Sequence, residues 1–258
     1  MMTRSEKMTF ENASGQELAA RLELPEKAPR AFAIFAHCFT CSKDVAAASR
    51  ISRALGAHGI GVLRFDFTGL GNSEGDFANT NFSSNVQDLC SAAEHIGQQF
   101  APPRLLIGHS LGGAAVLAAS IRIDSVEATC TIGAPSEPRH VLKHMQCSLD
   151  EIERDGEAEV TLAGRAFRIQ RQFIEDVSEV RLLDTVRELN NPLLILHAPD
   201  DDVVDIDHAR RIYAAANHPK SFVALGEADH LLTDRRDSQF AADLIAVWAG
   251  RYLGLERE

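Results

Sequence analysis

A serine stands at the centre of a Gly-x-Ser-x-Gly motif, which reads Gly108-His109-Ser110-Leu111-Gly112. An apolar run precedes the motif at 104–107, and a run rich in small residues follows it at 114–120. This context is typical of a nucleophile elbow, a sharp strand-to-helix turn that exposes the serine hydroxyl. The amide of Leu111, at the start of the helix, would then face a developing oxyanion. A plain Gly-Ser turn between a strand and a helix is the alternative.

Two later segments carry the residue types that a serine nucleophile needs. A serine hydroxyl is weakly nucleophilic at neutral pH, so it requires a base, and the base requires a carboxylate to orient it. In parallel α/β sheets such groups gather at the carboxyl ends of the strands. His230 follows the last predicted strand, and the acidic run 200–202 follows the strand before it. The order serine, aspartate, histidine along the chain indicates a catalytic triad.

The elements around these motifs alternate between strands and helices. We predict strands at 31–37, 61–66, 104–107, 126–133, 192–197 and 221–225, and helices at 44–58, 81–100, 206–217 and 240–252. A β-hairpin formed by 8–12 and 17–24 precedes them, and 67–76 is a glycine-rich surface loop. This order predicts a mostly parallel sheet that helices cover on both faces.

The alternation breaks at 136–190, where charged residues are dense. Two strands are expected at 157–161 and 165–169, around a turn at Ala163 and Gly164, with a helix at about 173–180. Long insertions in compact domains tend to be lids or binding loops, so we interpret the segment as a cap over the cleft. A surface excursion without a role is the alternative. The whole chain, 1–258, is then a single domain that contains this cap.

Composition excludes some classes of partner. The chain has 258 residues and a formal net charge of −11, which argues against nucleic acid and anionic membranes as partners. The first ten residues lack the apolar run of a signal peptide, and no stretch approaches 18 apolar residues. We therefore expect a cytoplasmic protein whose partner is a small acyl substrate, and a homodimer is possible.

These segments together resemble the α/β-hydrolase superfamily over essentially the whole chain. The matching pieces are the His37-Cys38-Phe39 turn, the run Asp66-Phe67-Thr68-Gly69-Leu70-Gly71-Asn72-Ser73, the elbow, the acidic loop and Asp229-His230. The resemblance implies an α/β-hydrolase fold with Ser110, Asp201 and His230 as the triad. Asp201 is chosen over its two neighbours because the acid of this family lies two residues before a Val-Val or Val-Pro pair, here at Val203.

The resemblance also implies the rest of the site. The second oxyanion donor would be the backbone N–H of Phe39, with the ring of His37 packed under the same turn. Cys38 stands where many relatives have glycine, and it is expected in the substrate pocket with His37 and His109. More narrowly, the run from His37 to Asp44 resembles the hydrolase domain that is fused to an OsmC-type domain in some bacteria.

Five cysteines, at 38, 41, 90, 130 and 147, fit a reduced interior. Cys38 and Cys41 form only half of a zinc site, so we predict no metal. Acyl transfer by a serine triad also needs no organic cofactor, and we predict none. We interpret the pair as structural thiols, with redox sensitivity as the alternative. Both thiols are expected to react with a thiol reagent in the native reduced protein, and a failure of both to react before denaturation would argue against a redox role.

The sequence thus predicts a serine hydrolase, most simply a carboxylesterase, that acts through an acyl-enzyme on Ser110. A thioesterase, or a cofactor-free perhydrolase or haloperoxidase, could use the same triad. A partner-binding module with a vestigial triad is the alternative from a different class.

Overall fold

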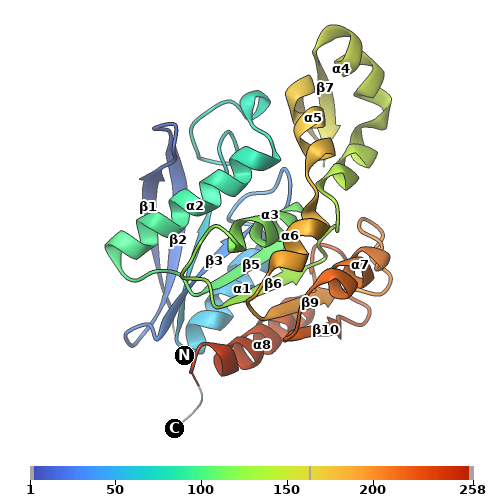
Figure 1. Cartoon of the computed structure of the whole chain (residues 1–258). Helices are drawn as coiled ribbons and strands as arrows, with labels where there is room; N and C mark the ends of the chain where they lie inside the picture. Colours follow the sequence, from blue (N-terminus) through green and yellow to red (C-terminus); the bar gives the residue numbers. More distant parts are fainter. Residues whose placement is uncertain (1–2, 163, 256–258) are drawn as a thin grey trace.

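The computed structural model describes residues 3–162 and 164–255 and centres on one twisted sheet (Figure 1). From edge to edge the sheet consists of β1 (Thr3–Glu11), β2 (Glu17–Pro25), β4 (Ile60–Phe65), β3 (Ala31–Ala36), β5 (Leu105–His109), β6 (Ala128–Ile132), β9 (Leu193–His197) and β10 (Lys220–Ala224). The β1–β2 hairpin is antiparallel and joins β4 in antiparallel register, whereas all other neighbours pair in parallel. The α/β-hydrolase fold expected from the sequence is confirmed.

Helices cover both faces of the sheet. One face holds α1 (Ala46–Ala57) and α8 (Arg235–Tyr252), and the other holds α2 (Phe82–Gln99), α3 (Leu111–Ser120), α6 (Leu182–Glu188) and α7 (Asp207–Ala215). The central strands β3, β4, β5, β6 and β9 are buried along their whole length. Their mostly apolar sequences follow from this burial on both faces, although β4 contains the buried Arg64 and β6 the buried Thr129 and Thr131.

Capping side chains set the starts of two helices, and the predicted helix starts differ from the observed ones by one to five residues. Helix α8 begins at Arg235, five residues before the predicted start at 240, because the Asp234 carboxylate accepts from the Arg236 amide. Helix α2 begins after Asn81, which forms a reciprocal capping box with Ser84. Helix α1 begins at Ala46 rather than at 44. The sequence pattern therefore locates the helices more reliably than their ends.

The segment after β6 departs from the sheet, as expected. It contains η2 (Pro138–Ser148), α4 (Leu149–Asp155), β7 (Glu157–Leu162), β8 (Arg165–Gln170) and α5 (Arg171–Glu179), and α4, β7 and α5 stand at the top of Figure 1. Strands β7 and β8 form a separate antiparallel pair, and Ala163, expected in their turn, lies outside the described residues. The buried side of this segment continues the apolar core that contains α2 and α3. The chain then returns to the sheet through α6, which packs on α3 and α7.

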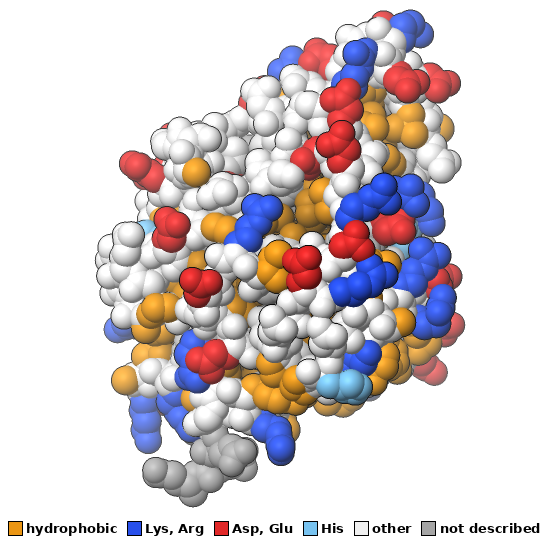
Figure 2. Space-filling view, viewed as in Figure 1, with side chains coloured by type: hydrophobic (Ala, Val, Ile, Leu, Met, Phe, Trp, Pro, Cys, Tyr) orange, Lys and Arg blue, Asp and Glu red, His pale blue; other side chains and the backbone are white. Residues whose placement is uncertain are grey.

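Charged side chains of both signs are mixed on the surface. Figure 2 shows blue and red side chains side by side near α6 and α7, where Arg187 pairs with Asp184 and Arg211 pairs with Asp207. Such exposed pairs contribute little to stability. Among the residues that the structure describes, no helix has both the length and the apolar character needed to span a bilayer.

Candidate active site

Ser110 occupies a sharp turn between β5 and α3. Its φ and ψ are 55° and −126°, a conformation that side chains rarely adopt, and its amide donates to the Ile132 carbonyl at 2.8 Å. The flanking glycines are required by close backbone approach. A Cβ at Gly108 would lie 2.3 Å from the Gly112 carbonyl oxygen, and one at Gly112 would lie 2.3 Å from the His37 oxygen. The turn therefore has the geometry of a nucleophile elbow.

The residues predicted as base and acid converge on this serine. His230 Nε2 lies 3.0 Å from Ser110 Oγ, and His230 Nδ1 lies 2.8 Å from Asp201 Oδ2. A carboxylate oxygen can only accept a hydrogen bond, so Nδ1 carries the proton and Nε2 keeps its lone pair for the serine hydroxyl. The three side chains come from β5–α3, from the loop after β9 and from the loop after β10.

Asp201 is held by a set of donors. Its Oδ1 accepts from the amides of Val203 at 3.0 Å and Val204 at 2.8 Å, while Oδ2 serves His230. Burial raises the pKa of Asp201, but the hydrogen bonds from His230 and from the two amides outweigh burial and hold that pKa below its usual value. The carboxylate is therefore ionised and fixed in orientation at neutral pH.

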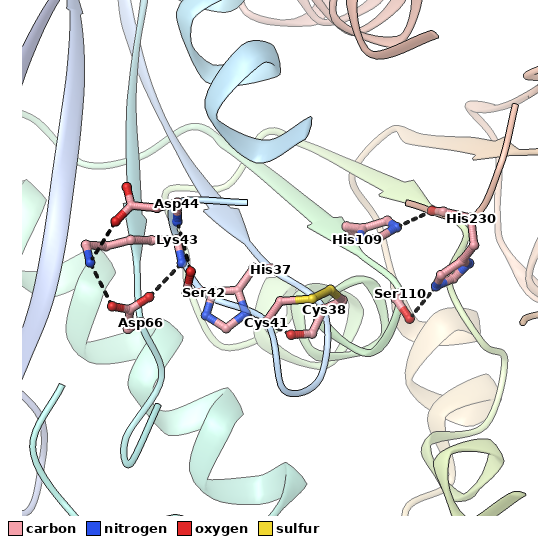
Figure 3. The surroundings of a disulfide bond; sticks show 10 residues. All are labelled: His37, Cys38, Cys41, Ser42, Lys43, Asp44, Asp66, His109, Ser110 and His230. Carbon is pink, nitrogen blue, oxygen red and sulfur yellow. Dashed lines mark hydrogen bonds and ion pairs between the residues drawn. A yellow bond between two sulfur atoms is a disulfide. The ribbon is translucent and has the colours of Figure 1, made fainter. Parts of the chain in front are cut away.

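His109 contacts the backbone of His230. Burial, reinforced by the nearby His230, lowers the pKa of His109 to about 4, so the ring is neutral at pH 7. Its Nε2 lies 2.7 Å from the backbone carbonyl oxygen of His230, which can only accept. Nε2 therefore carries the proton and donates it (Figure 3). This bond ties the end of β5 to the loop that carries His230.

The turn after β3, residues 37–43, approaches the serine from the other side. Buried His37 contacts Phe67 edge-on, and its Nδ1 donates to the Cys38 carbonyl at 2.8 Å. Burial is also the main cause of a lowered pKa for His37. The neutral ring thus packs under the turn and orients its backbone, as the family resemblance implied.

A buried ion pair anchors the far end of the same turn. Asp66 accepts from the backbone amide of Lys43 at 2.6 Å, from Lys43 Nζ at 2.7 Å and from the Asn72 amide at 3.0 Å. A Cβ at Gly71 would lie 2.2 Å from Asp66 Oδ2, so glycine is needed for the loop to close on this carboxylate. The Asp66–Ser73 run therefore has a structural role, because its pairing with Lys43 secures the exit of the turn.

Cys38 and Cys41 form a disulfide, with Cα atoms 5.4 Å apart. The expectation that these two cysteines are reduced thiols is therefore wrong for this structure. Their reaction with a thiol reagent concerns the reduced protein and stays a prediction. The physical reason is the tight turn, in which the Cys41 amide donates to the Cys38 carbonyl at 3.2 Å and Thr40 has a φ of 63°. This fold of the backbone brings the two side chains within bonding reach.

The ring of Phe39 packs against aromatic residues from elsewhere in the chain. It contacts Phe77 of η1 (Phe77–Asn79) at a centroid distance of 5.5 Å and stacks on Phe173 of α5 at 5.3 Å. Phe77 in turn contacts Phe167 of β8. These four rings, the aromatic cluster, join the turn after β3 to the segment that departs from the sheet.

A cavity of about 360 Å³ opens beside Ser110. Its lining is Cys38, Phe39, Thr40, Cys41, Ser110, Leu111, Pro135, His140, Val141, His144, Thr161, Leu162, Val203, Val204, His230 and Leu231. Cys38 lies in this lining as predicted, but His37 and His109 do not, because both rings are buried under the backbone that forms the wall. Six lining residues come from the segment between β6 and α6, and none of the described lining residues is Asp, Glu, Lys or Arg.

The described residues contain no group of three or more His, Cys, Asp or Glu side chains that could hold a metal ion. The arrangement supplies instead a hydroxyl, an imidazole and a carboxylate in series. A helix start also lies next to the serine, where the first amides lack partners within the helix. Such a set is suited to attack on a carbonyl carbon.

Comparison with known proteins identifies the family of the chain. A model of the alpha/beta hydrolase family matches residues 33–243. The chain belongs to this family. The esterase domain of a Rhodothermus marinus protein is 47% identical to this hydrolase and superposes with a TM-score of 0.79, covering 97% of this chain and 100% of that one.

Two further relatives are more distant. The mouse (Mus musculus) mitochondrial palmitoyl-protein thioesterase ABHD10 is 26% identical over 186 residues, which cover 69% of this hydrolase and 62% of the mouse protein. The hydrolase thus spans about three fifths of that relative. Est1E from Butyrivibrio proteoclasticus, solved with ferulic acid, is 18% identical, covers 96% of this chain and 99% of its own, and shares the fold with a TM-score of 0.78.

Sequence reasoning missed several residues around the site of this hydrolase. Lys43 and Asp66 lie inside motifs that match the family, yet their buried pairing was not foreseen. Their signal was weak, because Asp66 is a single charge directly after a mostly apolar strand and Lys43 lies in a loop. His140 and Phe173 carried no local signal, because only the folding of 136–190 brings them to the cavity and to Phe39.

Proposed function

We propose that this hydrolase cleaves carboxylic esters through an acyl-enzyme on Ser110. The observation that supports this most directly is the continuous relay from Ser110 Oγ to His230 at 3.0 Å and from His230 to Asp201 at 2.8 Å. His230 takes the serine proton as Oγ attacks the ester carbonyl, and Asp201 stabilises the imidazolium that forms. The 47% identity to an esterase domain agrees with this reaction.

The amides of Leu111 and Phe39 stabilise the oxyanion in this mechanism. One such donor typically contributes about 3 kcal/mol to the transition state. His230 then returns its proton to the leaving alcohol, and a water activated by the same histidine releases the acid. The chemistry needs no metal or organic cofactor.

The cavity lining favours an uncharged acyl group of moderate size. Its walls are largely apolar, and no described carboxylate, ammonium or guanidinium group lines it to recognise a charge. A cavity of about 360 Å³ has room for a short or medium acyl chain. The segment between β6 and α6 acts as a cap in this proposal, because it supplies His140, Val141 and His144 to the wall.

A thioester is the second candidate substrate. The mouse relative is named a palmitoyl-protein thioesterase, and the same triad attacks esters and thioesters alike. The ratio of kcat/KM for an oxygen ester and a thioester with the same acyl group separates the two. The 47% identity to the Rhodothermus marinus esterase domain favours the ester.

Labelling with a fluorophosphonate tests the proposal. We expect one adduct on the wild-type protein by intact mass and none on Ser110→Ala. p-Nitrophenyl esters of increasing chain length then define the acyl preference, with peracid formation measured in parallel for the perhydrolase alternative. A folded wild-type protein that gives no adduct would contradict the proposal and favour a binding module with a vestigial triad.

A further inference from the structure

The disulfide between Cys38 and Cys41 lies in the wall of the same cavity as Ser110 and His230. It encloses two residues, Phe39 and Thr40, and the amide of Phe39 is the proposed second oxyanion donor. Figure 3 shows the disulfide between His37 and Ser110, on the side of the turn that faces the elbow. The covalent link therefore spans the piece of backbone on which the proposed chemistry depends.

Without the disulfide, few hydrogen bonds would hold the backbone at the tip of this turn. Thr40 has a φ of 63°, in the left-handed region that favours glycine, so its conformation must be imposed by the surroundings. Within the turn, one hydrogen bond of 3.2 Å connects the Cys41 amide to the Cys38 carbonyl. The polar anchors lie outside the enclosed pair, at His37 before it and at Lys43 after it. Inside the pair, the aromatic cluster holds the ring of Phe39 but makes no hydrogen bond to its backbone amide. The disulfide is the covalent constraint on the backbone between His37 and Lys43.

The disulfide is also open to reagents. Cys38 is 5% exposed, whereas Cys41 is partly exposed and lines the cavity. A dithiol that enters the cavity would attack Cys41 Sγ, break the S–S bond and release the Cys38 thiolate. The second thiol of the reagent then displaces Cys41, so the reagent becomes a cyclic disulfide and the protein gains two electrons and two protons. Cys90, Cys130 and Cys147 are unpaired thiols and take no part.

We propose that the Cys38–Cys41 disulfide positions the second oxyanion donor, so that its reduction by a dithiol slows acyl transfer while the Ser110–His230–Asp201 relay stays assembled. The inference rests on the proposed function, because the donor matters only if an oxyanion forms. The relay does not pass through the turn: its contacts lie on β5–α3 and on the loops after β9 and β10. Reduction should therefore change kcat and leave KM nearly constant.

The experiment compares oxidised and reduced wild-type protein after the dithiothreitol has been removed without oxygen, since free thiols cleave p-nitrophenyl esters themselves. Maleimide labelling and intact mass confirm that reduction exposes two additional thiols. We expect kcat for a short p-nitrophenyl ester to fall about tenfold to a hundredfold. This is less than the roughly hundredfold to thousandfold fall for complete loss of one oxyanion donor, because reduction displaces the Phe39 amide without removing it. Reoxidation with oxidised glutathione should restore it.

Two variants sharpen the result. Cys38→Ser combined with Cys41→Ser should have the low kcat of the reduced protein and no response to dithiothreitol. Cys147→Ser, which removes an exposed free thiol, should respond like the wild type. Near-ultraviolet circular dichroism follows the fold of each form.

Three outcomes would overturn the inference. They are an unchanged kcat after two additional thiols are labelled, a loss of activity accompanied by unfolding or by an equal rise in KM, and a purified protein whose two cysteines cannot be oxidised to the disulfide. None of these affects the proposed function, which fails separately if the oxidised protein forms no fluorophosphonate adduct.

Discussion

The carboxylate of Asp201 accepts three hydrogen bonds, and this pattern makes Asp201→Asn a sharp test. Oδ1 accepts from the amides of Val203 and Val204, and Oδ2 accepts from His230. The asparagine must keep its oxygen toward the two amides, because the reverse orientation would leave two N–H groups facing an NH₂ group at about 1–3 kcal/mol each. Its NH₂ group therefore points at His230 Nδ1.

That orientation selects the wrong tautomer of the base. An NH₂ donor stabilises a lone pair on Nδ1 of His230, so the ring proton moves to Nε2, which faces Ser110 Oγ at 3.0 Å. Nε2 then has no lone pair to accept the serine proton. We expect kcat to fall about 10⁴-fold, the effect typical of this change in such triads. This corresponds to about 5.5 kcal/mol in the activation free energy.

The assay is ester hydrolysis at pH 7.5, with Ser110→Ala as the background. Asp202→Asn is the matched control, because Asp202 is exposed and is the next residue in the chain. We expect Asp202→Asn to keep the wild-type kcat. The free energy of unfolding of Asp201→Asn should lie within about 2 kcal/mol of the wild-type value, since the hydrogen bonds from the two backbone amides remain. If folded Asp201→Asn keeps more than about a tenth of the wild-type kcat, the Ser110–His230–Asp201 relay does not operate.

Three further predictions concern residues around the triad. Because the pKa of His109 is about 4 in the folded protein, its side chain binds more protons in the unfolded chain between about pH 6.5 and 4, and its contribution to the free energy of unfolding should fall by about 3 kcal/mol as pH drops through that window. His109→Gln keeps an N–H donor and should remove this share of the pH dependence in urea titrations, and an identical pH dependence would refute the assignment. Phe173→Ala should lower the free energy of unfolding in urea by about 3–5 kcal/mol. It should also lower kcat, because the ring of Phe39 loses its stacking partner, and a normal kcat would show that the turn does not need this contact. Gly112→Ala should abolish the fluorophosphonate adduct, since its Cβ would lie 2.3 Å from a carbonyl oxygen, whereas Gly250→Ala, which points into open space, should label normally.

The parts of the fold that were predictable are those with local signals. The central strands are buried on both faces, and this burial produces the unbroken apolar runs that mark them in the sequence. The elbow is recognisable because close backbone approach requires glycine on both sides of Ser110. Chain order and spacing then single out Asp201 and His230, and the structure brings both to the serine.

The unpredicted features depend on contacts between distant parts of the chain. His109 donates to a carbonyl 121 residues away, and Phe39 stacks on Phe173, so no local spacing encodes either contact. The disulfide was missed for a different reason. Whether two cysteines three positions apart can bond depends on the backbone turn between them, and composition favoured free thiols.

The aromatic cluster limits how this enzyme can acquire new substrates. Phe39 contributes its backbone to the turn beside the nucleophile and its ring to a stack with Phe77 and Phe173. Under the proposed function, we therefore expect exchange of 138–179 for the corresponding segment of a relative to alter acyl selectivity and turnover together. Selectivity and catalytic rate are not modular here, and a transplanted segment would need an aromatic partner for position 39 before it could serve a new substrate well.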